Sequence, residues 1–376
     1  MTAEAIRGRL VLDDAIVPGE IRVDDGVISA VEPDGRGSAG PLLAPGFIDV
    51  HVHGWGGHSA MGDAAALDGM ARALLRQGVT SFLPTAWTEP IPELAEFAER
   101  LRTWIPAAPR DGSSPLGFNL EGPFLSEAKK GAHDPAKLRA PADVADSDLE
   151  PLLDGLRLIT IAPEVPGALD LIARLTARGV RVSLGHSAAT LAEANAGYAA
   201  GATTTTHLFN AMSGVDHHHP GLAVAALSND DAYVELIADG NHVDPSLLPI
   251  ITRSKPPSRL MLVSDALSLA GTGLSRATLG GLEVEIVGGR VTLAGTSTLA
   301  GCVIALDTAV RNVTSSGIPL PAAIAAAATN PAAMLGQADR GRIAVGLRAD
   351  LVELDDGLRV RRVMRAGEWF EGAGTS

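Results

Sequence analysis

Cysteine is almost absent from this chain of 376 residues. Its single cysteine, Cys302, excludes an intramolecular disulfide and a zinc cluster held by several thiolates. Long apolar runs are absent as well, since no segment approaches the roughly 20 apolar residues that a membrane-spanning helix requires. The first residues include Glu4, Asp13 and Asp14, so they lack the continuous apolar stretch of a secretory signal. We therefore expect a cytoplasmic protein that does not bind a membrane.

Basic residues are too few to balance the acidic ones. The chain has 30 Lys and Arg against 44 Asp and Glu, which gives a net charge of -14. Because this charge repels polyanions, we expect neither nucleic acid nor an anionic membrane surface as a partner. A small molecule that carries a phosphate would have to be held by local groups.

From Phe47 onward, the sequence alternates between two kinds of segment. Short apolar segments rich in β-branched residues are followed by Ala/Leu-rich stretches of helical period, a pattern typical of parallel strands joined by helices. Gly78, Gly179 and Gly201 lie where a left-handed residue would end a helix. Eight strands are predicted, the number of a (β/α)8 TIM barrel. They are residues 47–54, 80–87, 116–124, 156–164, 181–188, 203–211, 233–243 and 259–266.

The two ends of the chain resemble each other. Residues 6–31 and 340–371 each predict short strands separated by Asp/Gly turns. We expect a small β-sandwich domain formed by both termini (1–46 plus 336–376), with the barrel (47–335) between them. The alternative is two unrelated sheet extensions that cap the barrel. Residues 278–295 predict an inserted β-hairpin.

Polar residues recur where the predicted strands end, which is the catalytic face of such a barrel. Any one of the histidines among them could be a hydrogen-bonded core residue. Left unpaired, however, each buried polar group costs about 1–3 kcal/mol, so the set as a whole predicts a bound cation. The set comprises His51 and His53 on the first strand, Glu121 on the third, His186 on the fifth, His207 on the sixth and Asp265 on the eighth.

The residue types restrict the cation. Imidazole and carboxylate ligands suit Zn, Fe(II), Mn or Co, and one or two cations per subunit would fit. His51 and His53 are two apart in a strand and so point the same way. None of the four lysines ends a predicted strand, which argues against a carbamylated bridging lysine and against Schiff-base chemistry. Glu121 is therefore the expected bridging or central carboxylate.

Asp265 is the expected general base. It follows the apolar run LMLV, where an ionised carboxylate needs a partner. It could take a proton from water and deliver it to a leaving amine, or be a structural aspartate that caps the next loop. His133 is placed to stabilise an oxyanion, or is an exposed loop histidine. Taken alone, residues 217–219 (HHH) could be a solvated turn.

Eight motifs together resemble the N-acetylglucosamine-6-phosphate deacetylases of the amidohydrolase superfamily, over essentially the whole chain. They are PGFIDVHVHG, LEGPF, KKGAHDP, GHSAAT, THLFNAMS, LIADGNHVD, LVSDA and ATNPAAMLG. The resemblance implies hydrolysis of the N-acetyl group of N-acetylglucosamine 6-phosphate to glucosamine 6-phosphate and acetate. It also implies that the protein forms a homodimer.

The resemblance further implies roles for individual residues. Glu121, His186 and His207 would be the shared metal ligands, and His51 with His53 would add a second metal position. Asp265 would be the catalytic acid/base, and His133 would contact the sugar and the reacting carbonyl. Sugar and phosphate contacts, some of them across a dimer interface, would come from Asn210, Ala211 and His242. Without the resemblance, Asn210 and His242 could be strand-end caps.

Two departures from the family pattern bear on substrate binding. His218 stands where members usually have a phosphate-binding arginine, and a histidine cannot offer the same permanently charged fork. Lys129 and Lys130 could contribute instead. Cys302 stands where a serine is common beside the acetyl pocket. Other readings are an amidohydrolase for N-acyl-amino-acid or cyclic amide substrates, and an inactive barrel that has kept the fold.

Overall fold

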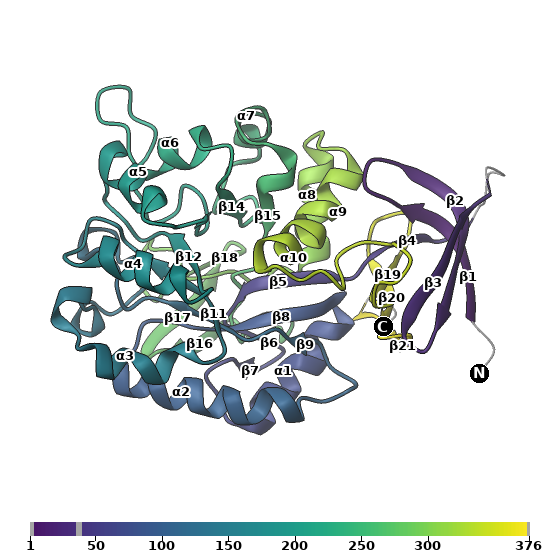
Figure 1. The fold of residues 1–376 in the computed structure, drawn as a ribbon, viewed down its shortest axis with the longest axis horizontal. Helices are drawn as coiled ribbons and strands as arrows, with labels where there is room; N and C mark the ends of the chain where they lie inside the picture. The colour runs from purple at the N-terminus through teal and green to yellow at the C-terminus, as the bar shows by residue number, and fades with distance from the viewer. Residues whose placement is uncertain (1–3, 35–39, 374–376) are drawn as a thin grey trace.

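Eight parallel strands follow one another around a barrel, as predicted (Figure 1). The computed structural model describes residues 4–34 and 40–373. The last strand returns to the first, because Asp265 N–H donates to His51 O at 2.9 Å and His53 N–H donates to Ala266 O at 2.9 Å. The strands are β5 (Phe47–Val52), β8 (Val79–Ala86), β10 (Phe118–Glu121), β11 (Leu156–Ile161), β12 (Arg181–Leu184), β13 (Thr204–Thr205), β14 (Tyr233–Leu236) and β15 (Leu260–Leu262).

Helices cover the outside of the barrel and bury one apolar face each. In the first of them, Leu67, Met70, Ala71 and Leu74 recur at helical spacing and are buried, and the side chain of Asp63 caps the N-terminus. The glycines expected to end helices all have positive φ, as at Gly78 with φ 88°. The helices are α1 (Ala64–Arg76), α2 (Ile91–Trp104), α3 (Asp146–Leu153), α4 (Ala168–Ala177), α5 (Leu191–Ala199), α6 (Leu222–Ser228), α7 (Leu248–Ser254), α8 (Leu306–Ser315), α9 (Leu320–Ala327) and α10 (Thr329–Leu335).

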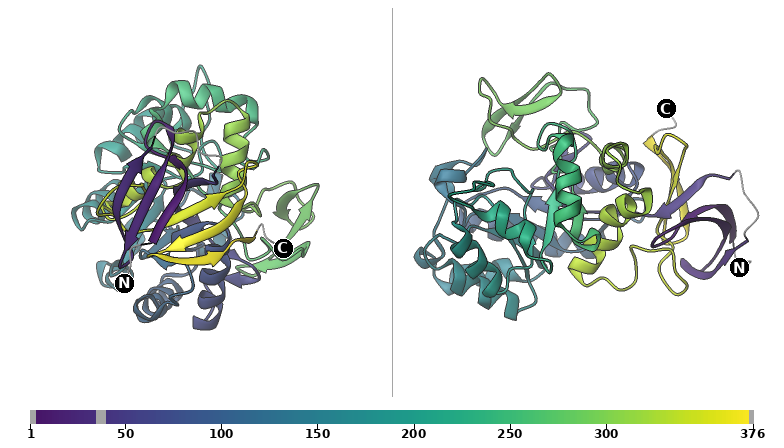
Figure 2. Two further views of the ribbon diagram at one scale, coloured as in Figure 1. Left: turned by 90° about the vertical axis from the view of Figure 1, so that its right-hand side faces the viewer. Right: turned by 90° about the horizontal axis from the view of Figure 1, so that it is seen from above.

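Both ends of the chain contribute to one further sheet, which lies beside the barrel (Figure 2). Its seven strands are hydrogen-bonded in the order β21-β20-β19-β4-β1-β2-β3. Apolar side chains from both halves, among them Leu10, Ile21, Leu351 and Met364, form one buried cluster, as expected for a sandwich-like layer. The strands are β1 (Glu4–Val11), β2 (Ile16–Asp24), β3 (Val27–Pro33), β4 (Leu42–Pro45), β19 (Leu351–Leu354), β20 (Val360–Arg365) and β21 (Glu368–Glu371).

The fold class is thus confirmed: a (β/α)8 barrel with a β-layer built from the termini. For the domain boundaries we propose the predicted division, 1–46 plus 336–376 and 47–335, of which residues 1–3, 35–39 and 374–376 lie outside the described residues. Where we expected an inserted hairpin, the chain forms three antiparallel strands: β16 (Arg276–Leu279), β17 (Leu282–Val287) and β18 (Arg290–Leu293).

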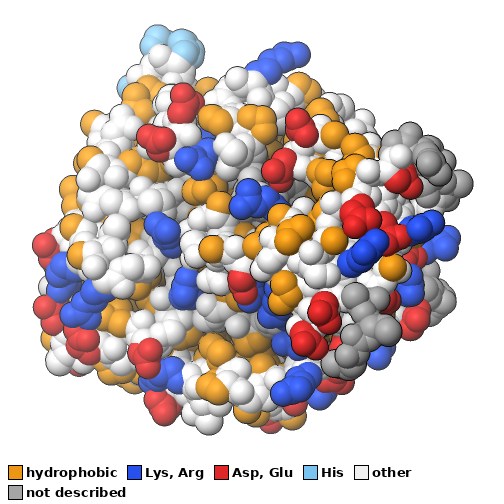
Figure 3. Space-filling model, turned by 45° about the vertical axis from the view of Figure 1, so that its right-hand side comes forward, with side chains coloured by type: hydrophobic (Ala, Val, Ile, Leu, Met, Phe, Trp, Pro, Cys, Tyr) orange, Lys and Arg blue, Asp and Glu red, His pale blue; other side chains and the backbone are white. Residues whose placement is uncertain are grey.

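Several short elements complete the described part of the chain. Its helices include no candidate for a membrane span. The face shown in Figure 3 intermixes acidic and basic side chains, and histidines protrude at one corner. The short elements are β6 (Gly54–Trp55), β7 (His58–Ser59), β9 (Ser114–Pro115), η1 (Ile105–Ala107), η2 (Glu127–Lys129), η3 (Pro135–Lys137), η4 (Pro141–Asp143), η5 (Pro245–Leu247) and η6 (Pro257–Arg259).

Candidate active site

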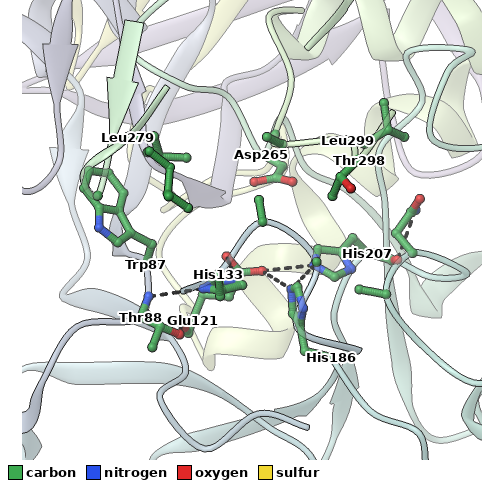
Figure 4. Close-up of a pocket in the computed structure, with 18 of the residues that line it drawn as sticks. Trp87, Thr88, Glu121, His133, His186, His207, Asp265, Leu279, Thr298 and Leu299 are labelled. Carbon is green, nitrogen blue, oxygen red and sulfur yellow. Dashed lines mark hydrogen bonds and ion pairs between the residues drawn. The ribbon is translucent and has the colours of Figure 1, made fainter. Parts of the chain in front are cut away.

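A cavity of about 450 Å³ opens at the carboxyl ends of the barrel strands. Five of the six predicted metal-site residues line it; His51 alone is fully buried behind the wall. Figure 4 shows Glu121, His186 and His207 together on one side, with Asp265 facing them from the other. Strand ends converge at this face of a barrel, and this convergence brings together residues that are far apart in the sequence.

Glu121, His186 and His207 form the first group of ligand atoms. The Nε2 atoms of His186 and His207 each lie 3.0 Å from Glu121 Oε1 and 3.1 Å from each other. Glu121 ends β10, whereas His186 and His207 follow β12 and β13. Both histidines have positive φ, 45° and 26°, which L residues seldom adopt. Such strained backbone is found mainly at functional sites.

His51, His53 and Asp265 form the second group. The Nε2 atoms of the two histidines are 3.3 Å apart. Asp265 Oδ1 lies 3.2 Å from His53 Nε2 and 3.6 Å from His51 Nε2. Glu121 connects the two groups, because its Oε2 is 3.2 Å from His53 Nε2. This is the geometry expected of a bridging carboxylate.

The outer nitrogens of three imidazole rings are held by the protein. The Nδ1 atom of His51 donates to Glu235 Oε2 at 3.0 Å, that of His53 to Thr85 O at 3.1 Å and that of His186 to Lys129 O at 2.9 Å. These bonds leave each Nε2 with a lone pair directed to the centre, as in metal-bound histidines. Ligands at about 2.0–2.2 Å from a tetrahedral cation lie about 3.3–3.6 Å apart, which is close to the separations seen here. The donor set therefore fits a divalent cation.

His133 presents a proton to the cavity. Thr88 N–H donates to its Nδ1 at 3.3 Å, so in the neutral ring the proton resides on Nε2. That Nε2 atom is 3.4 Å from Glu121 Oε2. The ring also packs edge-on against His186, with centroids 4.6 Å apart. His133 is therefore a buried donor at the site and not an exposed loop histidine.

Asn210, Ala211 and His242 line the same cavity, as expected for substrate contacts. Asn210 Nδ2 donates to the carbonyls of His207 and Leu208, which fixes the amide. His242 Nδ1 donates to Asp239 Oδ2 at 2.9 Å. Burial raises the pKa of Asp239, but the His242 ring outweighs this effect and lowers the pKa to about 2.

His218 and Cys302 are not among the residues that line the cavity. His218 is exposed on the loop between β13 and α6, where the side chain of Asp216 accepts from the N–H groups of His218 and His219. Cys302 is buried behind the wall, and its N–H donates to Asp265 O at 2.8 Å. Within this chain, neither side chain is placed for the direct substrate contact that we expected, because the loop points outward and the thiol inward.

Comparison with known proteins identifies the family. Residues 42–370 match the model of the amidohydrolase family. The chain belongs to the amidohydrolase family. It is 38% identical to an N-acetylgalactosamine-6-phosphate deacetylase of Escherichia coli O157:H7 over 94% of this chain and 93% of that protein. It is 39% identical to the human N-acetylglucosamine-6-phosphate deacetylase over 96% of this chain and 90% of that one.

Solved structures are similar over almost the full length. An N-acetyl-D-glucosamine-6-phosphate deacetylase variant from Mycobacterium smegmatis, in complex with N-acetyl-D-glucosamine-6-phosphate, has a TM-score of 0.90 and 34% identity, and the match covers 98% of this chain and 99% of that one. The corresponding Thermotoga maritima enzyme has a TM-score of 0.91 and 33% identity, with 98% and 100% covered. This amidohydrolase is thus a metal-dependent hydrolase, and its His/Glu cluster has the geometry to hold a metal ion.

The carboxylates of this amidohydrolase draw positive charge to the centre of the site. Burial lowers the pKa of His53, but Asp265 and Glu121 outweigh this effect and raise the pKa to about 9. Burial raises the pKa of Glu121, yet His51 and His133 outweigh it and hold the pKa well below its usual range. His186 is the exception, because burial and the neighbouring His133 lower its pKa to about 4.

Several residues of this amidohydrolase site were not predicted from the sequence. Glu235, in β14, and Asp49, in β5, are fully buried behind the histidines. Glu164 accepts from Ser187 Oγ at 2.7 Å and so fixes the segment that carries His186. The available signal for Glu235 and Asp49 was an acidic residue in the middle of an apolar strand, in YVELIA and FIDVHV. Such a position costs free energy unless the charge has a partner.

Proposed function

We propose that this amidohydrolase removes the N-acetyl group of N-acetylglucosamine 6-phosphate, giving glucosamine 6-phosphate and acetate. The observation that carries the proposal is the position of Asp265, a carboxylate beside both histidine groups in a cavity that also contains a proton donor, His133. Relatives named as deacetylases of this substrate, at 39% identity over nearly the whole chain, support it. They do not favour an N-acyl-amino-acid or cyclic amide substrate.

We infer one or two divalent cations, Zn, Fe(II), Mn or Co, held by the two groups of ligands. Glu121, His186 and His207 would hold the first cation, and His51 and His53, with Asp265 and the shared Glu121, would hold the second. When bound, such a cation would polarise the acetyl carbonyl and would lower the pKa of a water molecule to about 7.

The side chains themselves would move and hold the protons. Asp265 takes a proton from the attacking water as the new C–O bond forms, and delivers it to the amide nitrogen as the C–N bond breaks. His133 donates its Nε2 proton in a hydrogen bond to the oxygen on which negative charge develops. Both groups are almost fully buried, so bulk water screens neither of them.

The phosphate would be bound at the edge of the cavity. Lys129 and His242 line it, and Asn210 and Ala211 are adjacent to them. Lys130 is placed to support the same loop, because its Nζ donates to His133 O at 3.3 Å. These groups are the local cations and donors that a chain of net charge -14 needs for a phosphorylated substrate.

A second substrate candidate comes from one specific observation. The relative that is 38% identical over 94% of this chain is named for N-acetylgalactosamine 6-phosphate, which differs in configuration at one hydroxyl. The geometry around Asp265 is equally suited to either sugar, because the reacting group is the same acetamide.

Acetate release tests the proposal. Both sugar 6-phosphates and unphosphorylated N-acetylglucosamine should be compared at equal concentration. We expect the phosphorylated glucosamine derivative to react fastest, with activity lost after chelation and restored by Zn or Co. Equal rates with and without phosphate would count against a phosphate site, and no acetate from any of the three would overturn the deacetylase assignment.

We further propose a cytoplasmic homodimer. A phosphorylated sugar does not cross membranes unaided, which supports a location inside the cell. His218 lies on a protruding loop outside its own cavity, so it could reach phosphate only from a second copy. Light scattering should give twice the chain mass of 38.6 kDa. His218→Ala should raise KM and leave kcat near normal; an unchanged KM would remove His218 from the phosphate site.

A further inference from the structure

Glu235 is a buried carboxylate that no step above uses. It lies in β14 with no exposed surface. Its Oε2 atom accepts from His51 Nδ1 at 3.0 Å and from the N–H of His207 at 3.3 Å. Its Oε1 atom has no hydrogen-bond partner among the described residues. A carboxylate in this position costs several kcal/mol unless positive charge compensates it.

Among the four histidines of the two ligand groups, His51 is the one whose outer nitrogen faces a carboxylate. His53 and His186 direct Nδ1 to neutral carbonyl oxygens instead. A charged acceptor raises the basicity of the imidazole beyond what a carbonyl does, and it fixes the proton on Nδ1. His51 Nε2 then has its lone pair on the side of His53, 3.3 Å away.

Asp49, the neighbouring buried carboxylate, makes different contacts. Asp49 Oδ1 accepts from the backbone N–H groups of His51 and Ser264, each at 3.3 Å, and so joins the first barrel strand to the segment that follows the last. Asp49 therefore acts on the backbone alone, whereas Glu235 contacts both the backbone of His207 and the ring of His51. Only Glu235 can transmit its charge through the imidazole of His51 to the ligand atom.

The number of buried charges also favours a second cation. Four carboxylates are buried in this cluster: Asp49, Glu121, Glu235 and Asp265. Among the described residues, no lysine or arginine forms an ion pair with any of them. Two divalent cations would balance four ionised carboxylates, whereas a single cation would leave two of these charges to be balanced by protonated histidines.

We propose that Glu235 is the positioning residue of the His51 half of the site, and that occupancy of a second cation there depends on it. This inference rests on the proposed metal-dependent deacetylase. Glu235 contacts the first group, Glu121, His186 and His207, only at the backbone N–H of His207 and at no ligand atom, so we expect the affinity for the first cation to be unchanged without it. Loss of such an outer partner typically weakens metal binding by about 10–100-fold.

Titration of the full-length, chelator-treated protein with Co²⁺ tests the proposal. Bound Co²⁺ would be counted by elemental analysis and followed by its visible absorption. We expect the wild type to bind two ions, and Glu235→Gln to bind the first with unchanged affinity and the second about 10–100-fold more weakly. Glu353→Gln is the matched control, because Glu353 is also a buried strand glutamate but lies in the terminal sheet, where it pairs with Arg362.

A double variant separates positioning from a merely structural effect. If Glu235 acts through His51, then adding Glu235→Gln to His51→Gln should not change Co²⁺ binding further. Glu235→Asp keeps the charge and should restore part of the affinity for the second Co²⁺ ion. The same variant tests the proposal if Glu235→Gln does not fold. Equal weakening of both ions, or no weakening, would overturn the proposal. If the wild type binds two ions, Glu235→Gln weakens only the second, and no acetate is released, the proposed deacetylase function is wrong. The positioning role of Glu235 would still stand.

Discussion

At the scale of single residues, the proposed chemistry depends on Asp265. Its backbone has φ 49°, and its carboxylate is 6% exposed and faces both groups of ligand atoms. The surrounding histidines lower its pKa below the usual range even though burial, the largest effect, raises it. The group is therefore ionised at neutral pH and able to accept a proton.

Asp265→Asn should lower kcat by about 10²–10⁴-fold, the usual effect of losing a general acid/base. Metal content should stay near normal, because Glu121 and four histidines remain. Steady-state kinetics and elemental analysis of the same preparation would check both statements. Retained activity would exclude Asp265 from proton transfer, and loss of metal would make it primarily a ligand.

Lys255 lies outside the active site, and its burial should make the stability of the protein depend on pH. It is 2% exposed, and its Nζ donates to the carbonyls of Ala226 and Asn229. Burial lowers its pKa from 10.5 to about 8. Between these two values the unfolded chain binds the proton and the folded chain does not, so the contribution of Lys255 to stability rises with pH across this window.

Urea unfolding of the wild type and of Lys255→Met at pH 7.5 and 9.5 would measure this contribution. The free energy of unfolding of the wild type, relative to the variant, should be larger at pH 9.5. A difference that stays constant or shrinks would contradict a lowered pKa. Lys130→Met, at a partly exposed lysine, is the control in which no such change is expected.

The sequence predicted which residues form the proposed ligand groups better than it predicted the residues that support them. The six residues of these groups could be found because each lies at a strand end, and barrel topology brings strand ends together. They are His51, His53, Glu121, His186, His207 and Asp265. Glu235 and Glu164 could not be assigned, because their partners are 184 and 23 residues away in the sequence and depend on side-chain direction. His218 and Cys302 were expected at the substrate from motif position alone, which does not determine whether a side chain faces the cavity of its own chain.

At the scale of elements, the three-stranded insert forms one wall of the cavity. Leu279, Gly280 and Leu282 line it, and Figure 4 shows Leu279 above Trp87. The sequence predicted a hairpin here, but two Gly-Gly pairs, 280–281 and 288–289, all with positive φ, make two turns and so three strands. The barrel strands were also predicted too long, as at 203–211, because His207, Phe209 and Ala211 have positive φ and end the strand early.

One lysine of a barrel loop, Lys137, connects the insert to the barrel. Lys137 Nζ lies 2.6 Å from Glu89 Oε2 and donates to Gly280 O at 3.3 Å. The other carboxylate oxygen of Glu89 accepts from Trp87 Nε1 at 2.9 Å. The tip of the first turn of the insert is thus fixed to the barrel mouth.

Lys137→Met should loosen this wall. If the contacts of Lys137 contribute about 1 kcal/mol to substrate binding, KM should rise about fivefold. The value of kcat should change little, because the reacting atoms lie at Asp265 and not at this wall. Arg276→Met is the control, since the pair of Arg276 with Glu285 lies on the exposed part of the same insert. A fall in kcat with unchanged KM would contradict a role confined to the wall.

At the scale of the whole molecule, the terminal sheet and the barrel share a core. Val11, Leu42 and Leu354 of the sheet belong to the same buried cluster as Phe47 and Leu74 of the barrel layer. Arginines from the C-terminal segment reinforce the contact, since Arg348 and Arg365 both donate to Ser114 Oγ. The sheet and the barrel, although distinct in topology, are therefore expected to unfold together.

Scanning calorimetry with Leu354→Ala tests this coupling. Leu354 has no exposed surface, and removal of such a leucine side chain typically costs about 2–5 kcal/mol. Because the cluster spans both parts, a single transition should move to lower temperature, and loss of catalytic activity on heating should move with it. Val345→Ala, at a position that is 62% exposed, should leave the transition in place. A separate low-temperature transition that leaves activity intact would mean that the sheet unfolds independently, because the shared core would then be too weak to couple it to the barrel.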